Sequence, residues 1–129
     1  MLKQFYMNGD LWKVQFVSQH DNVLIDRTGK HTLAVSDYST MTISIANNLH
    51  GEFLNRVFIH ELGHCVMFSY GLLPELHRMV KKRYWVDAEE FLCNILADYG
   101  HFVIGTARDI LGNQFTYVAP IEAERMIVA

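Results

Sequence analysis

Apolar and polar residues alternate along several short segments in the first third of the chain. In residues 11–17, Trp12 and Val14 alternate with Lys13 and Gln15. A period of two in a segment rich in aromatic and β-branched residues is typical of a strand with one buried face. We therefore predict a strand over residues 11–17.

Three further segments in this part of the chain predict strands. A short apolar run covers residues 23–25, and residues 26–30 read as a hairpin loop because Gly29 can take a positive φ at low cost. Residues 32–35 would form the returning strand. The clearest pattern covers residues 40–46, which begin at Thr40 and end at Ala46, with apolar and hydroxylated side chains on opposite faces.

The remainder of the chain has the three- and four-residue spacing of amphipathic helices. Residues 51–70 form the longest such pattern, which Gly71 can close. A short basic helix or turn is expected over residues 74–84. Asp87 is a candidate N-cap, with Glu90 in capping-box position, for a helix over residues 88–104.

A short last helix is expected over residues 121–128, behind Pro120. Strands therefore come first and helices follow, which favours an α+β fold over alternating α/β. We expect a small, mostly N-terminal antiparallel sheet packed on the helix over 51–70 and on a following antiparallel helix.

Length and composition favour one packed domain over residues 1–129. Half of the residues are hydrophobic, 19% are charged, and the net charge is −3. This balance excludes a disordered tail and gives no strong field for nucleic acid or an anionic membrane. No apolar run approaches the ~20 residues that span a bilayer, and the first ten residues do not resemble a signal peptide. Two cysteines do not make a disulfide scaffold, so we expect a cytoplasmic protein.

The chemistry of the chain is concentrated in residues 60–64, which read His-Glu-Leu-Gly-His. Positions i and i+4 of a helix share a face, so His60 and His64 can present two imidazoles to one metal ion. Glu61 can then reach a water at that ion without being a ligand. The pattern resembles the HExxH signature of zinc metallopeptidases, in which the glutamate is the general base.

A catalytic zinc site needs a third protein ligand. The metzincin class is excluded, because it needs a glycine at position 67 and a histidine at position 70. Glu90 is the best-placed ligand, since it lies in the first turn of an apolar helix that returns past the motif. Glu89 is expected to face solvent, while Asp98 and His101 are more distant and could orient a ligand. The candidates are thus His77, Glu89, Glu90, Asp98 and His101.

Residues 90–97 read Glu-Phe-Leu-Cys-Asn-Ile-Leu-Ala. Together with the HELGH motif, they resemble the ImmA/IrrE-type metallopeptidases, which carry HExxH and then a Glu-x-x-Ala-Asn-x-Phe-Ala-like helix. Cys93 stands where that family has alanine, and Leu96 stands where it has phenylalanine. The resemblance covers roughly residues 11–100. It implies a minimal single-domain member with Glu90 as third zinc ligand, similar to compact forms carried by phages and mobile elements.

Other interpretations stay open at this point. In a SprT-like zinc protease, His77 would be the third ligand, and the basic and aromatic stretch over residues 78–85 would follow it. That stretch could also contact nucleic acid, although a solvated connector is the better interpretation. A third alternative is a catalytically idle interaction domain with a structural zinc ion.

The resemblance implies a zinc-dependent endopeptidase that acts on an intracellular protein. His60, His64 and Glu90 would hold Zn²⁺, and Glu61 would take a proton from water and pass it to the leaving amine.

An extended substrate would pair with the strand over residues 40–46 as an edge strand. Tyr70, Tyr84, Tyr99 and His77 are the candidates for stabilising the oxyanion. Cys65 and Cys93 are expected to be small core residues rather than ligands.

Overall fold

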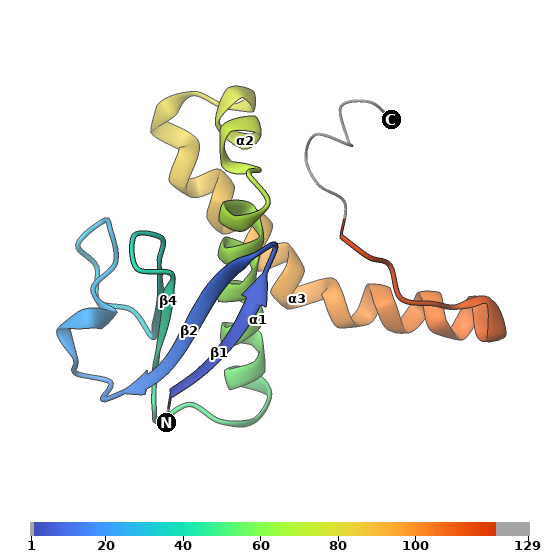
Figure 1. The fold of residues 1–129 in the computed structure, drawn as a ribbon, viewed down its shortest axis with the longest axis horizontal. Coiled ribbons are helices and arrows are strands. Elements are labelled where there is room, and N and C mark those ends of the chain that lie inside the picture. Colours follow the sequence, from blue (N-terminus) through green and yellow to red (C-terminus); the bar gives the residue numbers. More distant parts are fainter. Residues whose placement is uncertain (1, 121–129) are drawn as a thin grey trace.

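A computed structural model describes residues 2–120, in which four strands precede three helices (Figure 1). The α+β class predicted from the sequence is confirmed. The strands are β1 (Leu2–Met7), β2 (Asp10–Val17), β3 (Ala34–Asp37) and β4 (Thr42–Ala46). The helices are α1 (Gly51–Ser69), α2 (Leu73–Met79) and α3 (Trp85–Leu111), with short 3-10 turns at Asn22–Leu24, Lys82–Tyr84 and Gly112–Gln114.

The sheet is mixed, which corrects the prediction of an antiparallel one. Its strand order is β1-β2-β4-β3, and β2 pairs with β4 in parallel while the other two pairs are antiparallel. After β2 the chain forms the β3–β4 hairpin, and β4, the second strand of this hairpin, lies against β2. β4 is an inner strand that pairs along both of its edges, and residues 43–46 are all buried.

The core lies between the sheet and α1. Trp12, Val14, Ile43 and Ile45 project from β2 and β4 toward Cys65 of α1, and all five are buried. The indole Nε1 of Trp12 donates to Oγ of Ser69, 2.8 Å away, which satisfies the one polar atom of that buried ring. This packing fixes α1 across the sheet and so fixes the direction in which its histidines point.

The predicted strands are only partly confirmed. Residues 11–17 lie in β2, and residues 42–46 form β4, whereas Met41 takes a positive φ of 50° before β4 begins. The run over 23–25 forms a 3-10 turn instead of a strand, although an antiparallel bridge between Ile25 and His31 closes the predicted loop. The returning strand begins at Ala34 rather than at residue 32.

The helices follow the sequence pattern more closely. The helix predicted over 51–70 is α1, and the segment after Gly71 forms α2 and a 3-10 turn. The last described helix is longer than predicted at both ends, because α3 begins at Trp85 and includes Asp87 in its first turn. Asp87 is therefore not the N-cap, a position that Tyr84 occupies without a side-chain cap bond. The helix predicted over 121–128 lies outside the described residues.

α3 runs antiparallel to α1 for only its first half. Glu90 contacts His64, Asn94 contacts His60, and Asp98 pairs with Arg56, so α3 passes the motif in the direction opposite to α1. Beyond this contact, α3 extends away from α1 and the sheet (Figure 1). None of the helices within residues 2–120 combines the length and the apolar character that a membrane crossing requires.

Candidate metal centre

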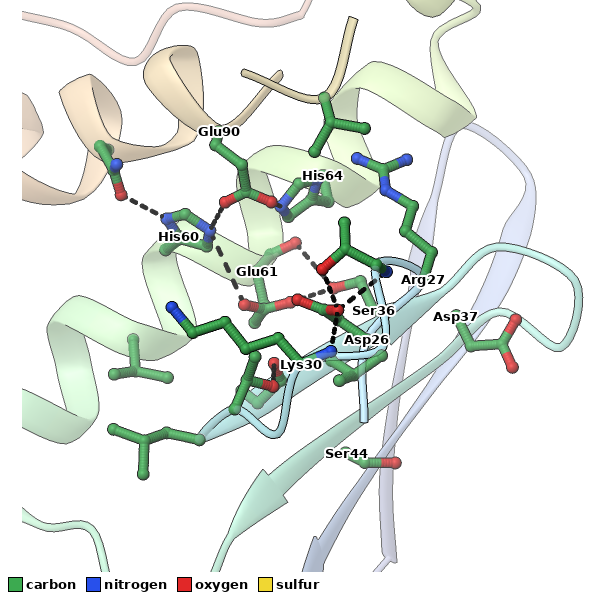
Figure 2. Close-up of a pocket in the computed structure, with 18 of the residues that line it drawn as sticks. Asp26, Arg27, Lys30, Ser36, Asp37, Ser44, His60, Glu61, His64 and Glu90 are labelled. Atoms are coloured by element: carbon green, nitrogen blue, oxygen red, sulfur yellow. Dashed lines mark hydrogen bonds and ion pairs between the residues drawn. The ribbon is translucent and has the colours of Figure 1, made fainter. Parts of the chain in front are cut away.

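The two histidines of the motif face the same residue of α3. The Nε2 atom of His60 lies 2.9 Å from Oε2 of Glu90, and Nε2 of His64 lies 3.2 Å from Oε1. Figure 2 shows the Glu90 carboxylate placed between the two imidazole rings. The structure thus brings together the three residues that the sequence predicted as metal ligands.

These spacings suit a metal ion. Two ligand bonds of ~2.0–2.1 Å at a tetrahedral angle place neighbouring ligand atoms about 3.3 Å apart. The observed separations, 2.9 and 3.2 Å, are close to that value. Moreover, two imidazole nitrogens that face one carboxylate need positive charge between them, either as protons or as a cation. In the metal-free chain the pKa of Glu90 lies well below its ordinary value, because hydrogen bonds from His60 and His64 favour the carboxylate.

The remaining ring nitrogen of each histidine has its own partner. Nδ1 of His60 donates to Oδ1 of Asn94, 2.8 Å away. Nδ1 of His64 lies 3.0 Å from the Tyr38 hydroxyl, which itself donates to Oε1 of Glu89 at 3.4 Å. The hydroxyl can therefore accept the Nδ1–H of His64. Each histidine can therefore keep a proton on Nδ1, so that Nε2, the atom that contacts Glu90 here, would be free to ligate an ion at the shared point.

Cys93 belongs to the same group of donors. One donor atom each of His60, His64 and Cys93 lies within 4.8 Å of the others, so these three residues could also hold a metal ion. The thiol is buried, and this burial raises its pKa above the ordinary value, which opposes the thiolate form that binds metals. Both cysteines are free and buried, as expected for small core residues.

The close approach of α1 and α3 explains the glycine of the motif. A Cβ atom added at Gly63 would lie 2.9 Å from Sγ and 3.3 Å from Cα of Cys93. A side chain at position 63 would therefore push α3 outward, together with Glu90 and Asn94. Glycine lowers helix propensity at position 63, but its lack of a side chain allows α1 and α3 to approach this closely.

Glu61 lies beside the histidines without sharing their contact to Glu90. It is only 6% exposed, its Oε2 is 3.9 Å from Nε2 of His60, and its Oε1 accepts a 2.7 Å hydrogen bond from the Ser36 hydroxyl. Burial raises the pKa of Glu61, and the Ser36 hydrogen bond opposes that rise. A carboxylate with a raised pKa, fixed in one orientation, suits a general base.

Glu89 is buried, which corrects the prediction that it faces solvent. Only 2% of it is exposed, and its Oε1 accepts a 2.7 Å bond from Arg27. Its Oε2 lies 2.9 Å from Nε2 of His77, whose ring stacks on Trp85 at 4.2 Å. Helix periodicity alone predicted an exposed Glu89. In the structure, α2 and the loop over 26–30 cover the side of α3 that carries this residue.

The other sequence candidates are placed away from the shared point. His77 bonds to Glu89, so it is not positioned as the third ligand of a SprT-like site. Asp98 is exposed and pairs with Arg56, and His101 is exposed one turn further along α3. None of the four candidates for oxyanion stabilisation lines the cleft over the site, whereas Tyr38, which the sequence did not indicate, does.

A cleft of about 1020 Å³ opens over the site. The loop over 26–30 and β3 form one wall, and α1 and α3 form the other. The edge strand beside the cleft is β3, because β4 pairs on both sides with β2 and β3. This corrects the expectation that residues 40–46 form the edge.

The backbone of Ser36 faces away from β4 and toward the open edge of the sheet. The N–H of Ala46 donates to the Leu33 carbonyl, so Leu33 is a hydrogen-bonded position of the antiparallel β3–β4 ladder. Because bonded and non-bonded positions alternate along such a ladder, Ser36, three residues further on, is a non-bonded position.

Comparison of the chain with family models, with curated proteins and with solved structures gives no match. The resemblance to the ImmA/IrrE-type metallopeptidases accordingly stays a prediction from the HELGH motif and the Glu90 helix.

Proposed function

We propose that this protein is a zinc-dependent endopeptidase related to the ImmA/IrrE type. The observation that carries the proposal is the convergence of His60, His64 and Glu90 on one point, with Glu61 buried beside it. A structural zinc site is normally closed by four protein ligands, whereas three ligands and an adjacent carboxylate leave a position for substrate or water. The two free, buried cysteines fit a cytoplasmic location, where thiols stay reduced.

His60, His64 and Glu90 would hold Zn²⁺, which when bound acidifies a water molecule and polarises a carbonyl group. Glu61 would accept the proton of the attacking water and deliver it to the leaving nitrogen of the cleaved bond. Ser36 holds the Glu61 carboxylate in place through its 2.7 Å hydrogen bond. Asn94 and Tyr38 hold the two imidazoles with Nε2 directed to the ion.

An extended peptide would be bound by strand addition at β3. The backbone N–H and C=O of Ser36 point away from β4, and the Ser36 side chain contacts Glu61. A peptide paired with β3 would therefore have its backbone within reach of the general base. Main-chain pairing gives affinity with little dependence on sequence, and the side chains that line the cleft would add the specificity.

The test is hydrolysis of a library of denatured cytosolic proteins by the zinc-loaded chain, with the new amino termini identified by mass spectrometry. The matched control is Glu61→Gln, which keeps the size and the hydrogen bond from Ser36 but removes the base. We expect cleavage by the parent, a loss of at least a hundredfold in the variant, and equal zinc content in both. Equal cleavage by parent and variant, or no cleavage by a fully zinc-loaded parent, would contradict the proposal.

A further inference from the structure

The second half of α3 carries a large apolar face that nothing in the described chain covers. At 100° per residue, Leu92, Ile95, Leu96, Tyr99, Phe102 and Val103 fall within 60° of one line along the helix, and Thr106 and Ile110 continue it. The six are between 41% and 74% exposed, and Ile110 is 79% exposed. We call these eight positions the arm face.

The arm face points away from the body of the protein. The residues of α3 that contact α1, Glu90, Asn94 and Asp98, lie on the other side of the helix or at its margin. An apolar stripe more than 100° wide normally packs against another element. Here it projects into solvent along a helix that Figure 1 shows extending beyond the sheet and α1.

We propose that the arm face binds a second copy of this chain, through antiparallel pairing of two α3 helices. The midpoint of the face is residue 101, so a twofold axis there would set Leu92 of one copy opposite Ile110 of the other, and Tyr99 opposite Val103. The bodies would then lie on the outer sides of the helix pair. This pairing brings large side chains of the face together at its ends and near its centre, sets Leu96 opposite Thr106, and leaves room for Phe102 opposite Gly100. It does not depend on the proposed peptidase activity.

The size of the face fits a weak dimer. Positions 92–110 span about 27 Å at 1.5 Å per residue, and the third of the helix circumference that the face covers is roughly 400 Å² of accessible surface over this length. Two copies would bury about 800 Å², which is the size of a weak, transient interface. The face carries no charged side chain, so two identical copies can meet on a twofold axis without like-charge repulsion.

Other occupants fit less well. A helix that lies on a membrane surface is rich in lysine and arginine, but α3 has Arg108 alone against five acidic residues. The segment over 121–129 of the same chain offers only four large apolar side chains by sequence, too few for the arm face.

The test is sedimentation of the full chain over a range of concentrations. The matched pair is Val103→Glu and Ile104→Glu, because the two neighbours are 59% and 57% exposed, but only Val103 lies on the arm face. We expect the parent to dimerise with a dissociation constant in the micromolar range, Val103→Glu to dimerise at least tenfold more weakly, and Ile104→Glu to behave as the parent.

The orientation is tested by disulfide trapping. Equal amounts of Leu92→Cys and Ile110→Cys chains should give the mixed disulfide in preference to either homodimer, since Cys65 and Cys93 are buried. Preferential Leu92→Cys homodimers would overturn the antiparallel arrangement. A parent that is monomeric at every concentration would overturn the proposal, and flotation of that monomer with phosphatidylserine vesicles would assign the arm face to a membrane surface instead. Equal weakening by both glutamate variants would also overturn it.

Discussion

Removal of the Tyr38 hydroxyl tests whether the residues behind His64 support metal binding. This oxygen lies 3.0 Å from Nδ1 of His64 and 3.4 Å from Oε1 of Glu89. The Tyr38 ring also stacks on Phe68, with centroids 4.9 Å apart. Because Tyr38→Phe keeps the ring and its stacking, the variant removes the two hydrogen bonds and little else.

The expected effect is a weaker metal site in a folded protein. Loss of a hydrogen-bond partner behind a metal-bound histidine typically lowers metal affinity 10–100-fold, or about 1.4–2.7 kcal/mol. Without the hydroxyl, the Nδ1–H of His64 lacks its acceptor, and the ring can rotate or carry its proton on Nε2. Glu89→Gln should act on the same histidine through Tyr38, since Glu89 accepts the hydroxyl proton and is itself held by Arg27.

The assay is zinc competition against a chromophoric chelator, with thermal unfolding as the check on folding. The control is Tyr99→Phe, which removes a hydroxyl from an exposed tyrosine of α3. We expect Tyr38→Phe to lose 10–100-fold in zinc affinity, Tyr99→Phe to lose none, and Glu89→Gln to add little in the Tyr38→Phe background. Full zinc affinity in Tyr38→Phe, or fully additive effects of the two variants, would refute this reasoning.

Three further predictions concern the residues around the site. Gly63→Ala should destabilise the protein by about 1–3 kcal/mol in urea unfolding, because the new Cβ would lie 2.9 Å from Sγ of Cys93. A second substitution, Cys93→Ala, should restore part of this loss. Unchanged stability of Gly63→Ala would contradict the close packing of α1 and α3. Ser36→Ala should move the acidic limb of the pH–activity profile to higher pH, because the Ser36 hydroxyl lowers the pKa of Glu61 and activity needs its ionised form; an unmoved limb would separate Ser36 from the base. Burial raises the pKa of Cys65 to about 12, so the folded protein should not react with Ellman's reagent at pH 8. Its stability should also fall as pH rises above about 9, where the unfolded state releases the thiol proton first; rapid labelling of the folded chain would refute the burial argument.

The chemistry of the site was largely predictable because it is local. The i, i+4 spacing of His60 and His64 sets both imidazoles on one face of α1, and the helix that returns past them brings Glu90 to that face. The position of Glu89 was not predictable from helix periodicity, because its burial depends on Arg27 and His77, which come from a loop and from α2.

The strands were less predictable. β1 was missed, although the sequence Asn8-Gly9 is a strong signal for a two-residue hairpin turn. In the structure these two residues form the turn between β1 and β2, with φ of 48° and 85°. The alternation of apolar residues over 40–46 could not reveal that β4 lies inside the sheet. That position depends on parallel pairing with β2, which is distant in sequence. The edge of the cleft was therefore assigned to the wrong strand.

The central claim is that His60, His64 and Glu90 form a zinc site, and zinc X-ray absorption of the purified, zinc-loaded chain tests it most directly. We predict one zinc ion per chain with nitrogen and oxygen ligands at ~2.0–2.1 Å, retained in Cys93→Ala and lost or much weakened in Glu90→Ala. A sulfur ligand at ~2.3 Å that disappears in Cys93→Ala would assign the third position to Cys93 instead. Failure of the folded chain to bind zinc at all would contradict the metal centre and the peptidase proposed from it.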